Sequence, residues 1–169
     1  RPGTVAIDFY AHEPLKISKS NETRSFWGED ELIAWVFKSG VTAPIRVDLG
    51  PVALLEEEVE KYLDHLVPNR GGRALRSKKA RPGSRLTQLL WEPLAKQIGQ
   101  AETVFVSPDS FLATLPLETL PIGEEEFLVE QHAFVYSQDL VSLATQGAAM
   151  EDREGPLLAV GGVVYDESA

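Results

Sequence analysis

The chain has no cysteine among its 169 residues, and it has only three histidines, His12, His65 and His132. Without cysteine it can hold no disulfide, no thiolate metal ligand and no thiol nucleophile. The histidines fall on separate predicted elements, which gives a histidine metal site little support. We therefore expect no metal and no cofactor, and any cysteine chemistry would have to come from other polypeptide.

The sequence also lacks a long apolar run of about 18 residues, which argues against a membrane span. Its first residues, Arg1-Pro2-Gly3-Thr4, include neither an initiator methionine nor an apolar targeting stretch. These observations predict a cytoplasmic segment from within a longer protein. Because 43% of the residues are hydrophobic and 25% charged, we expect an ordinary buried core.

Basic residues are scarce outside one short region. The formal net charge is −10, which argues against general nucleic-acid binding because phosphates would be repelled. Seven of the 16 basic residues lie between Arg70 and Arg85, with no acidic residue among them. We interpret residues 68–83, which are rich in proline and glycine, as a solvated loop. Docking of an acidic partner or nucleic acid on this loop is the alternative.

The first half of the chain predicts a β-meander followed by a helix. Residues 5–10 and 45–49 alternate with period two, and residues 31–37 form an apolar run before Lys38-Ser39-Gly40. Pro51 is expected at the first position of a helix, where its missing N–H costs nothing. The apolar face of that helix is spaced at helical intervals and comprises Leu55, Val59, Tyr62, Leu63 and Leu66.

The second half alternates helical and strand patterns. Ser84 is expected to cap a helix that Pro93 should bend, with a buried stripe made of Leu86, Leu89, Leu90, Leu94 and Ile98. Strands are expected at residues 103–107, 133–136 and 157–160, and a short helix at 139–145. The pattern predicts one α/β domain over residues 1–169, with a partly parallel sheet and flanking helices, which needs a further C-terminal segment to complete the sheet.

Residues 104–120 carry the most specific motif. They read Val-Phe-Val-Ser-Pro-Asp-Ser-Phe-Leu-Ala-Thr-Leu-Pro-Leu-Glu-Thr-Leu. This string resembles the CHAT domain signature, an apolar strand followed by Pro-Asp-Gly, a leucine and Leu-Pro-Phe-Glu-x-Leu. Ser110 and Leu117 depart from it, and Ser110 implies a turn that either avoids positive φ or takes another geometry.

Other short motifs stand in the family's order. They are Val47-Asp48-Leu49-Gly50-Pro51, Leu90-Trp91-Glu92-Pro93-Leu94, Phe127-Leu128-Val129-Glu130, Phe134-Val135-Tyr136-Ser137 and Leu157-Leu158-Ala159-Val160-Gly161. Gly161-Gly162 departs from the family's Gly-Asp-Pro. The chain thus resembles the N-terminal portion of a CHAT domain, a bacterial, caspase-like and separase-like cysteine peptidase family.

The resemblance implies a catalytic pair that this chain does not contain. In the family a histidine in an Ala-Thr-His-Gly-like motif assists a cysteine in an Ala-Cys-like motif, and both motifs would lie beyond Ala169. The implied partners are a C-terminal segment of the same protein, a protein substrate, and a sensor or adaptor such as TPR repeats. The chain alone is then inactive, and a non-catalytic, partner-binding CHAT-like module is the competing interpretation.

Within the chain, Asp109 and Glu118 are the candidate substrate-binding residues, because both lie in the signature that follows a strand. The structural alternative is that Asp109 closes an Asx turn and Glu118 accepts hydrogen bonds from buried backbone N–H groups. A triad of Ser110, His132 and an acid is a weaker hypothesis, because no nucleophile elbow surrounds Ser110. His132 is better interpreted as a structural histidine.

The remaining hypotheses concern proteolytic processing and the role of the tryptophans. Arg76, Lys79 and Arg81 in the basic loop, and Ala169 at the end of the chain, are candidate processing sites. Trp27, Trp35 and Trp91 are interpreted as packing residues rather than as a platform for bases.

Overall fold

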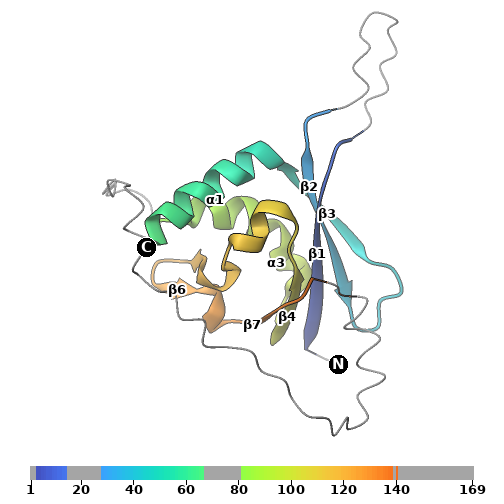
Figure 1. Cartoon of the computed structure of the whole chain (residues 1–169). Coiled ribbons are helices and arrows are strands. Elements are labelled where there is room, and N and C mark those ends of the chain that lie inside the picture. Colours follow the sequence, from blue (N-terminus) through green and yellow to red (C-terminus); the bar gives the residue numbers. More distant parts are fainter. Residues whose placement is uncertain (1–2, 15–27, 67–80, 139, 141–169) are drawn as a thin grey trace, which may run out of the picture.

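The structure is a computed structural model that describes residues 3–14, 28–66, 81–138 and 140. In this part of the chain five strands form one sheet in the order β3-β2-β1-β4-β7 (Figure 1). The strands are β1 (Thr4–His12), β2 (Glu31–Lys38), β3 (Ile45–Pro51), β4 (Thr103–Ser107) and β7 (Ala133–Tyr136). Strands β1, β2 and β3 pair antiparallel, whereas β1, β4 and β7 are parallel. The meander and the partly parallel α/β sheet are confirmed.

Helical segments connect these strands. They are α1 (Val52–Leu66), α2 (Ser84–Leu86), the π-helical turn η1 (Thr87–Trp91), α3 (Glu92–Ile98), and the 3₁₀ turns η2 (Ser110–Thr114), η3 (Leu117–Thr119) and η4 (Leu128–Glu130). A small hairpin, β5 (Pro121–Ile122) with β6 (Glu126–Phe127), lies between the last two turns. None of the helices in the described ranges is long and apolar enough to cross a membrane.

The core lies between the sheet and these helical segments. The buried side of β1 carries Val5, Ile7 and Phe9, which period-two alternation places on one face. Against it pack the apolar stripe of α1 and the stripe of residues 86–98, as the helical spacing predicts. The leucines of the signature, Leu112, Leu115, Leu117 and Leu120, are also buried in this cluster.

Three local expectations were wrong. Pro51 is the last residue of β3, and α1 begins at Val52, whose N–H donates to the Asp30 carbonyl. Leu66, at the end of α1, is 40% exposed. Ser84 lies inside the helix, and Gly83 takes the N-cap position with φ of 84°. The helix widens just before Pro93: the Glu92 N–H donates to Thr87, five residues back, which suits a proline that lacks its own donor.

Several expected features lie outside the described residues. They are the strand at 157–160, residues 67–80 of the basic loop and, apart from residue 140, the helix at 139–145.

Candidate active site

The signature residues lie at the carboxyl edge of the parallel strands. Asp109 follows β4 by two residues, and its Oδ2 accepts a hydrogen bond of 2.9 Å from the N–H of Ala11 near the end of β1. The interaction joins residues 98 positions apart and ties the two neighbouring strands together where both end. In open α/β sheets this edge is where ligands bind. The Asx-turn expectation is wrong, because Asp109 caps the following turn with its backbone and not with its side chain.

Glu118 reaches the same edge from the turn η3. Its Oε2 accepts a hydrogen bond of 2.5 Å from the hydroxyl of Tyr136, and that hydroxyl in turn accepts from the Leu117 N–H at 2.9 Å. Tyr136 is the last residue of β7 and pairs with Val106 of β4. The backbone N–H is therefore satisfied by Tyr136 rather than by Glu118, which corrects the structural alternative. Tyr136 itself was missed, because its partner depends on a chain reversal that no local pattern reveals.

Partial burial, and next the hydrogen bond to Glu118, raise the pKa of Tyr136 well above its usual range. The neutral hydroxyl is thus favoured in the folded state. The pKa of Tyr136 in the folded state exceeds its unfolded value of about 10. The contribution of this side chain to the free energy of unfolding is therefore complete below pH 10 and declines as pH rises above it.

Replacing Tyr136→Phe tests this pair. We expect the free energy of unfolding at pH 8 to fall by about 1–2 kcal/mol, because the Leu117 N–H and the Glu118 carboxylate lose their partner. The difference from wild type should shrink between pH 9 and pH 11.5, measured by urea unfolding. Tyr10→Phe is the control, since Tyr10 is 54% exposed and its hydroxyl has no hydrogen bond to a described residue. A difference that is constant with pH would contradict the assignment.

The turn after Asp109 carries backbone strain. Ser110 has φ of 50°, and it is the sole non-glycine residue with positive φ in the described ranges. The expectation that this turn avoids positive φ or changes geometry is wrong: the serine takes the left-handed conformation that glycine would adopt. Its side chain is exposed, so nothing crowds the strained position.

This strain predicts opposite effects for two substitutions. Ser110→Gly should raise the free energy of unfolding by up to about 1 kcal/mol, because relief of left-handed strain outweighs the added freedom of the unfolded chain. Ser110→Val should lower it by about 1–2 kcal/mol, since a β-branched residue tolerates positive φ poorly. Thermal unfolding of the wild type and the two variants gives their order of stability. A Val variant as stable as the Gly variant would rule out the strain at Ser110.

The apolar side of the signature is anchored to the helices. The Tyr62 hydroxyl of α1 donates to the Thr119 carbonyl at 2.6 Å, and the Thr87 hydroxyl donates to the Pro121 carbonyl at 2.9 Å. The Leu128 N–H closes the segment with a bond of 3.0 Å to the Leu120 carbonyl. These bonds hold residues 117–121 rigidly behind the carboxyl edge.

The Ser110, His132 and acid triad is excluded by position. His132 is 7% exposed, and its Nδ1 is bonded to the Ala101 carbonyl at 2.6 Å. His132 precedes β7 and packs on Trp91, so it lies near the amino end of β4. Ser110 instead follows the carboxyl end of β4. The five residues of β4 place the two side chains about 15 Å or more apart. His132 is the structural histidine expected, and Trp91, 4% exposed, is the packing residue expected.

Arg81 is engaged by the β5–β6 hairpin. Its guanidinium donates to the Glu126 carbonyl at 3.0 Å and lies 4.1 Å from the centre of the Phe127 ring. A trypsin-like protease would need this side chain free, and the next residue is Pro82, whose ring restricts the backbone. These contacts disfavour Arg81 as a processing site. Arg76, Lys79, Ala169 and Trp27 lie outside the described residues.

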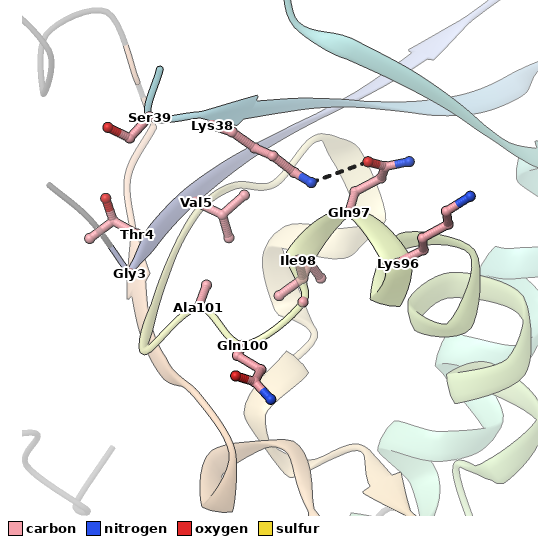
Figure 2. Close-up of a pocket in the computed structure, with 11 residues that line it drawn as sticks. Gly3, Thr4, Val5, Lys38, Ser39, Lys96, Gln97, Ile98, Gln100 and Ala101 are labelled. Carbon is pink, nitrogen blue, oxygen red and sulfur yellow. Dashed lines mark hydrogen bonds between the residues drawn. The ribbon is translucent and has the colours of Figure 1, made fainter. Parts of the chain in front are cut away.

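A surface hollow of about 420 Å³ lies at the opposite edge of the sheet (Figure 2). Gly3, Val5 and Ala101, which line it, come from the amino ends of β1 and β4, and Lys38 reaches across it to Gln97 at 3.2 Å. It is therefore separate from the Asp109 edge. Within the described ranges no group of three or more histidine, aspartate or glutamate side chains is arranged to hold a metal ion.

A family model described as CHAT domain matches residues 80–168, slightly more than half of the chain. The match contains the whole signature and the strands β4 and β7 that frame the Asp109 edge. Comparisons with curated proteins and with solved structures gave no match.

Proposed function

Because this chain belongs to the CHAT domain family, which is caspase-like, we propose that it is the N-terminal segment of a cysteine endopeptidase that cleaves a protein substrate. In this proposal the catalytic histidine and cysteine lie on polypeptide that follows Ala169. The cysteine thiolate attacks the peptide carbonyl, the amine leaves with a proton delivered through histidine, and water hydrolyses the thioester.

The observation that carries the proposal is the position of the signature. Asp109, Ser110 and Glu118 gather at the carboxyl edge of three parallel strands, the edge at which such sheets bind ligands. Strand β7 pairs within the described residues with β4 alone, so its other side can accept a further parallel strand. A nucleophile at the end of that strand would lie at the same edge of the sheet.

Asp109 is the residue of this chain best placed to touch substrate. One carboxylate oxygen is held by the Ala11 N–H, and Oδ1 has no partner among the described residues, so it can accept an N–H from a bound peptide. Glu118, which is held by the Tyr136 hydroxyl, lies at the same edge of the sheet.

The test uses a polypeptide extended past Ala169 and a set of protein and peptide substrates. We expect the extended protein to cleave substrate and to lose cleavage on alkylation by iodoacetamide, whereas residues 1–169 alone give none. Replacing Asp109→Asn in the extended protein should lower kcat/KM about 10- to 100-fold through misplaced substrate, with Asp48→Asn as the exposed control. Hydrolysis by the 169 residues alone would refute the proposal, and an extended protein without a cysteine would support a partner-binding module instead.

Regulation by other segments belongs to the same proposal. An upstream sensor, such as TPR repeats, would act on the loops at the carboxyl edge, and proteolytic processing within the basic loop would fall at Arg76 or Lys79. Intact mass of the purified protein distinguishes one polypeptide from two pieces.

A further inference from the structure

The hollow at the amino ends of β1 and β4 is lined by positive charge (Figure 2). Its volume is about 420 Å³, and none of the residues that line it is acidic. Two lysines line it, Lys38 at the end of β2 and Lys96 on α3, so we name it the lysine hollow. Such a lining is unusual in a chain whose formal net charge is −10, because most of the surface repels anions.

The described part of the chain leaves few of its cations without a partner. It holds six lysines and arginines, namely Lys38, Arg46, Lys61, Arg81, Arg85 and Lys96. Arg46 and Lys61 form salt bridges with nearby carboxylates, and Arg81 is held by the β5–β6 hairpin. The other three make no ion pair with a described residue, and two of these three line the lysine hollow. The hollow therefore gathers positive charge that the described residues do not compensate.

The carboxyl end of α3 only partly accounts for these lysines. A helix end attracts cations because its last carbonyls lack partners. Here the N–H groups of Gly99 and Ala101 donate to carbonyls of the last turn at 2.9 and 3.3 Å, so the backbone itself satisfies part of this end. Lys38 donates to the side-chain oxygen of Gln97 at 3.2 Å, which is a neutral acceptor. Lys96 has no hydrogen bond to a described residue.

The lysine hollow is built on ordered backbone. Val5, Ile98 and Ala101, which line it, are also members of the buried core. The Gly3 carbonyl accepts a hydrogen bond of 2.8 Å from the Glu102 N–H and thus joins the start of β1 to the start of β4. The Glu102 side chain is exposed and forms no ion pair with either lysine. A preformed positive site of this kind lowers the cost of ordering when an anionic partner binds.

The chemistry of the lining favours a polypeptide over a small molecule. Small-molecule sites are mostly apolar and bury most of the ligand. The exposed residues of this lining are instead polar, and they include Ser39 and Gln100 beside Lys96. These side chains present hydroxyl, amide and ammonium donors, which suit the carboxylates of an acidic segment.

We propose that the lysine hollow binds an acidic segment of a partner polypeptide, whose aspartate or glutamate carboxylates pair with Lys38 and Lys96. Because the hollow lies at the edge of the sheet opposite to Asp109, a partner held there leaves the candidate active site open. The inference goes beyond the proposed function, and it applies equally to a peptidase segment and to a partner-binding module.

A fluorescein-labelled hexaglutamate peptide tests the charge complementarity by anisotropy with residues 1–169. Lys38→Gln combined with Lys96→Gln should weaken binding about tenfold, the loss expected for two exposed ion pairs. Arginine at both positions keeps the charges and should preserve the affinity. Lys61→Gln combined with Arg85→Gln removes two positive charges elsewhere and is the matched control, which should bind as the wild type does. Equal affinities of the two glutamine double variants would overturn the proposal.

Zero-length crosslinking locates the bound peptide. A carbodiimide joins carboxylates to lysine amines in contact with them, so mass spectrometry should find the hexaglutamate peptide on Lys38 or Lys96. Crosslinks confined to Lys78 and Lys79 would assign the acidic partner to the basic loop and refute the lysine hollow. Inorganic phosphate that competes as strongly as unlabelled peptide would refute the assignment to a polypeptide. Neither assay needs peptidase activity, so failure of this inference and failure of the proposed function are distinguishable.

Discussion

Replacing Gly83→Ala should lower the free energy of unfolding by about 2–4 kcal/mol, the sum of left-handed backbone strain and local overpacking. Gly83 has φ of 84°, which costs an L side chain energy wherever it occurs. A Cβ at this position would also lie 2.7 Å from Cε2 of Tyr62 and 2.9 Å from Cδ of Pro121. Both contacts are closer than real Cβ atoms tolerate, so the helix start, α1 or β5 must move.

Gly40→Ala is the matched control for this substitution. Gly40 has φ of 79°, and a Cβ there meets nothing within 4 Å, so the variant isolates the backbone strain of about 1–2 kcal/mol. Urea unfolding followed by circular dichroism measures both. If the two glycine variants lose the same stability, the contacts of Gly83 with Tyr62 and Pro121 are unimportant.

The location of Gly83 links stability to the candidate site. Tyr62, which the new methyl group would push, donates its hydroxyl hydrogen bond to Thr119 in the signature. If the extended protein is the proposed peptidase, Gly83→Ala should therefore abolish its activity at temperatures below its unfolding transition. Local displacement of η3 is the physical reason.

Periodicity predicted the strands of the five-stranded sheet, the main helices and the fold class. The alternation at Val5, Ile7 and Phe9 and the helical spacing at Leu55, Val59 and Tyr62 report burial directly, because each side chain's face follows from its position in the repeat. The 3₁₀ turns of the signature have no such repeat.

The long-range contacts of the site could not be predicted in this way. The bond from Ala11 to Asp109 spans 98 residues, and Tyr136 meets Glu118 only after the chain has folded back through β5 and β6. The family resemblance indicated which residues matter, but not their partners. For the same reason the opposite positions of Ser110 and His132 become clear only when the direction of β4 is known.

The face of the sheet turned away from α1 and α3 had a sequence signal that is visible in retrospect. Trp35, Phe37 and Phe105 alternate with the core residues Val36, Val104 and Val106, so β2 and β4 are apolar on both faces. Such strands are typical of sheets with two covering layers.

The two faces of the sheet can be compared by removing one residue type from each. The substitutions are Trp91→Ala and Trp35→Ala, and the quantity compared is the loss in the free energy of unfolding. Trp91 packs against His132 and Phe134 with ring centroids 5.7 and 5.6 Å apart, so its removal should cost about 3–5 kcal/mol. Trp35 is partly exposed on the sheet face turned away from α1 and α3, and its removal from residues 1–169 should cost less than about 1.5 kcal/mol. Unfolding must be followed by circular dichroism, because the substitutions remove fluorophores.

The extended protein changes the expected result for Trp35 alone. If the added polypeptide buries Trp35, Trp35→Ala creates a cavity there, and its cost should rise toward that of Trp91→Ala. The cost of Trp91→Ala should stay the same, because its surroundings are already complete. Equal costs for Trp35→Ala in the short and extended proteins would mean that the added polypeptide leaves the surroundings of Trp35 unchanged, and the paired measurement thus shows whether further polypeptide packs on this face of the sheet.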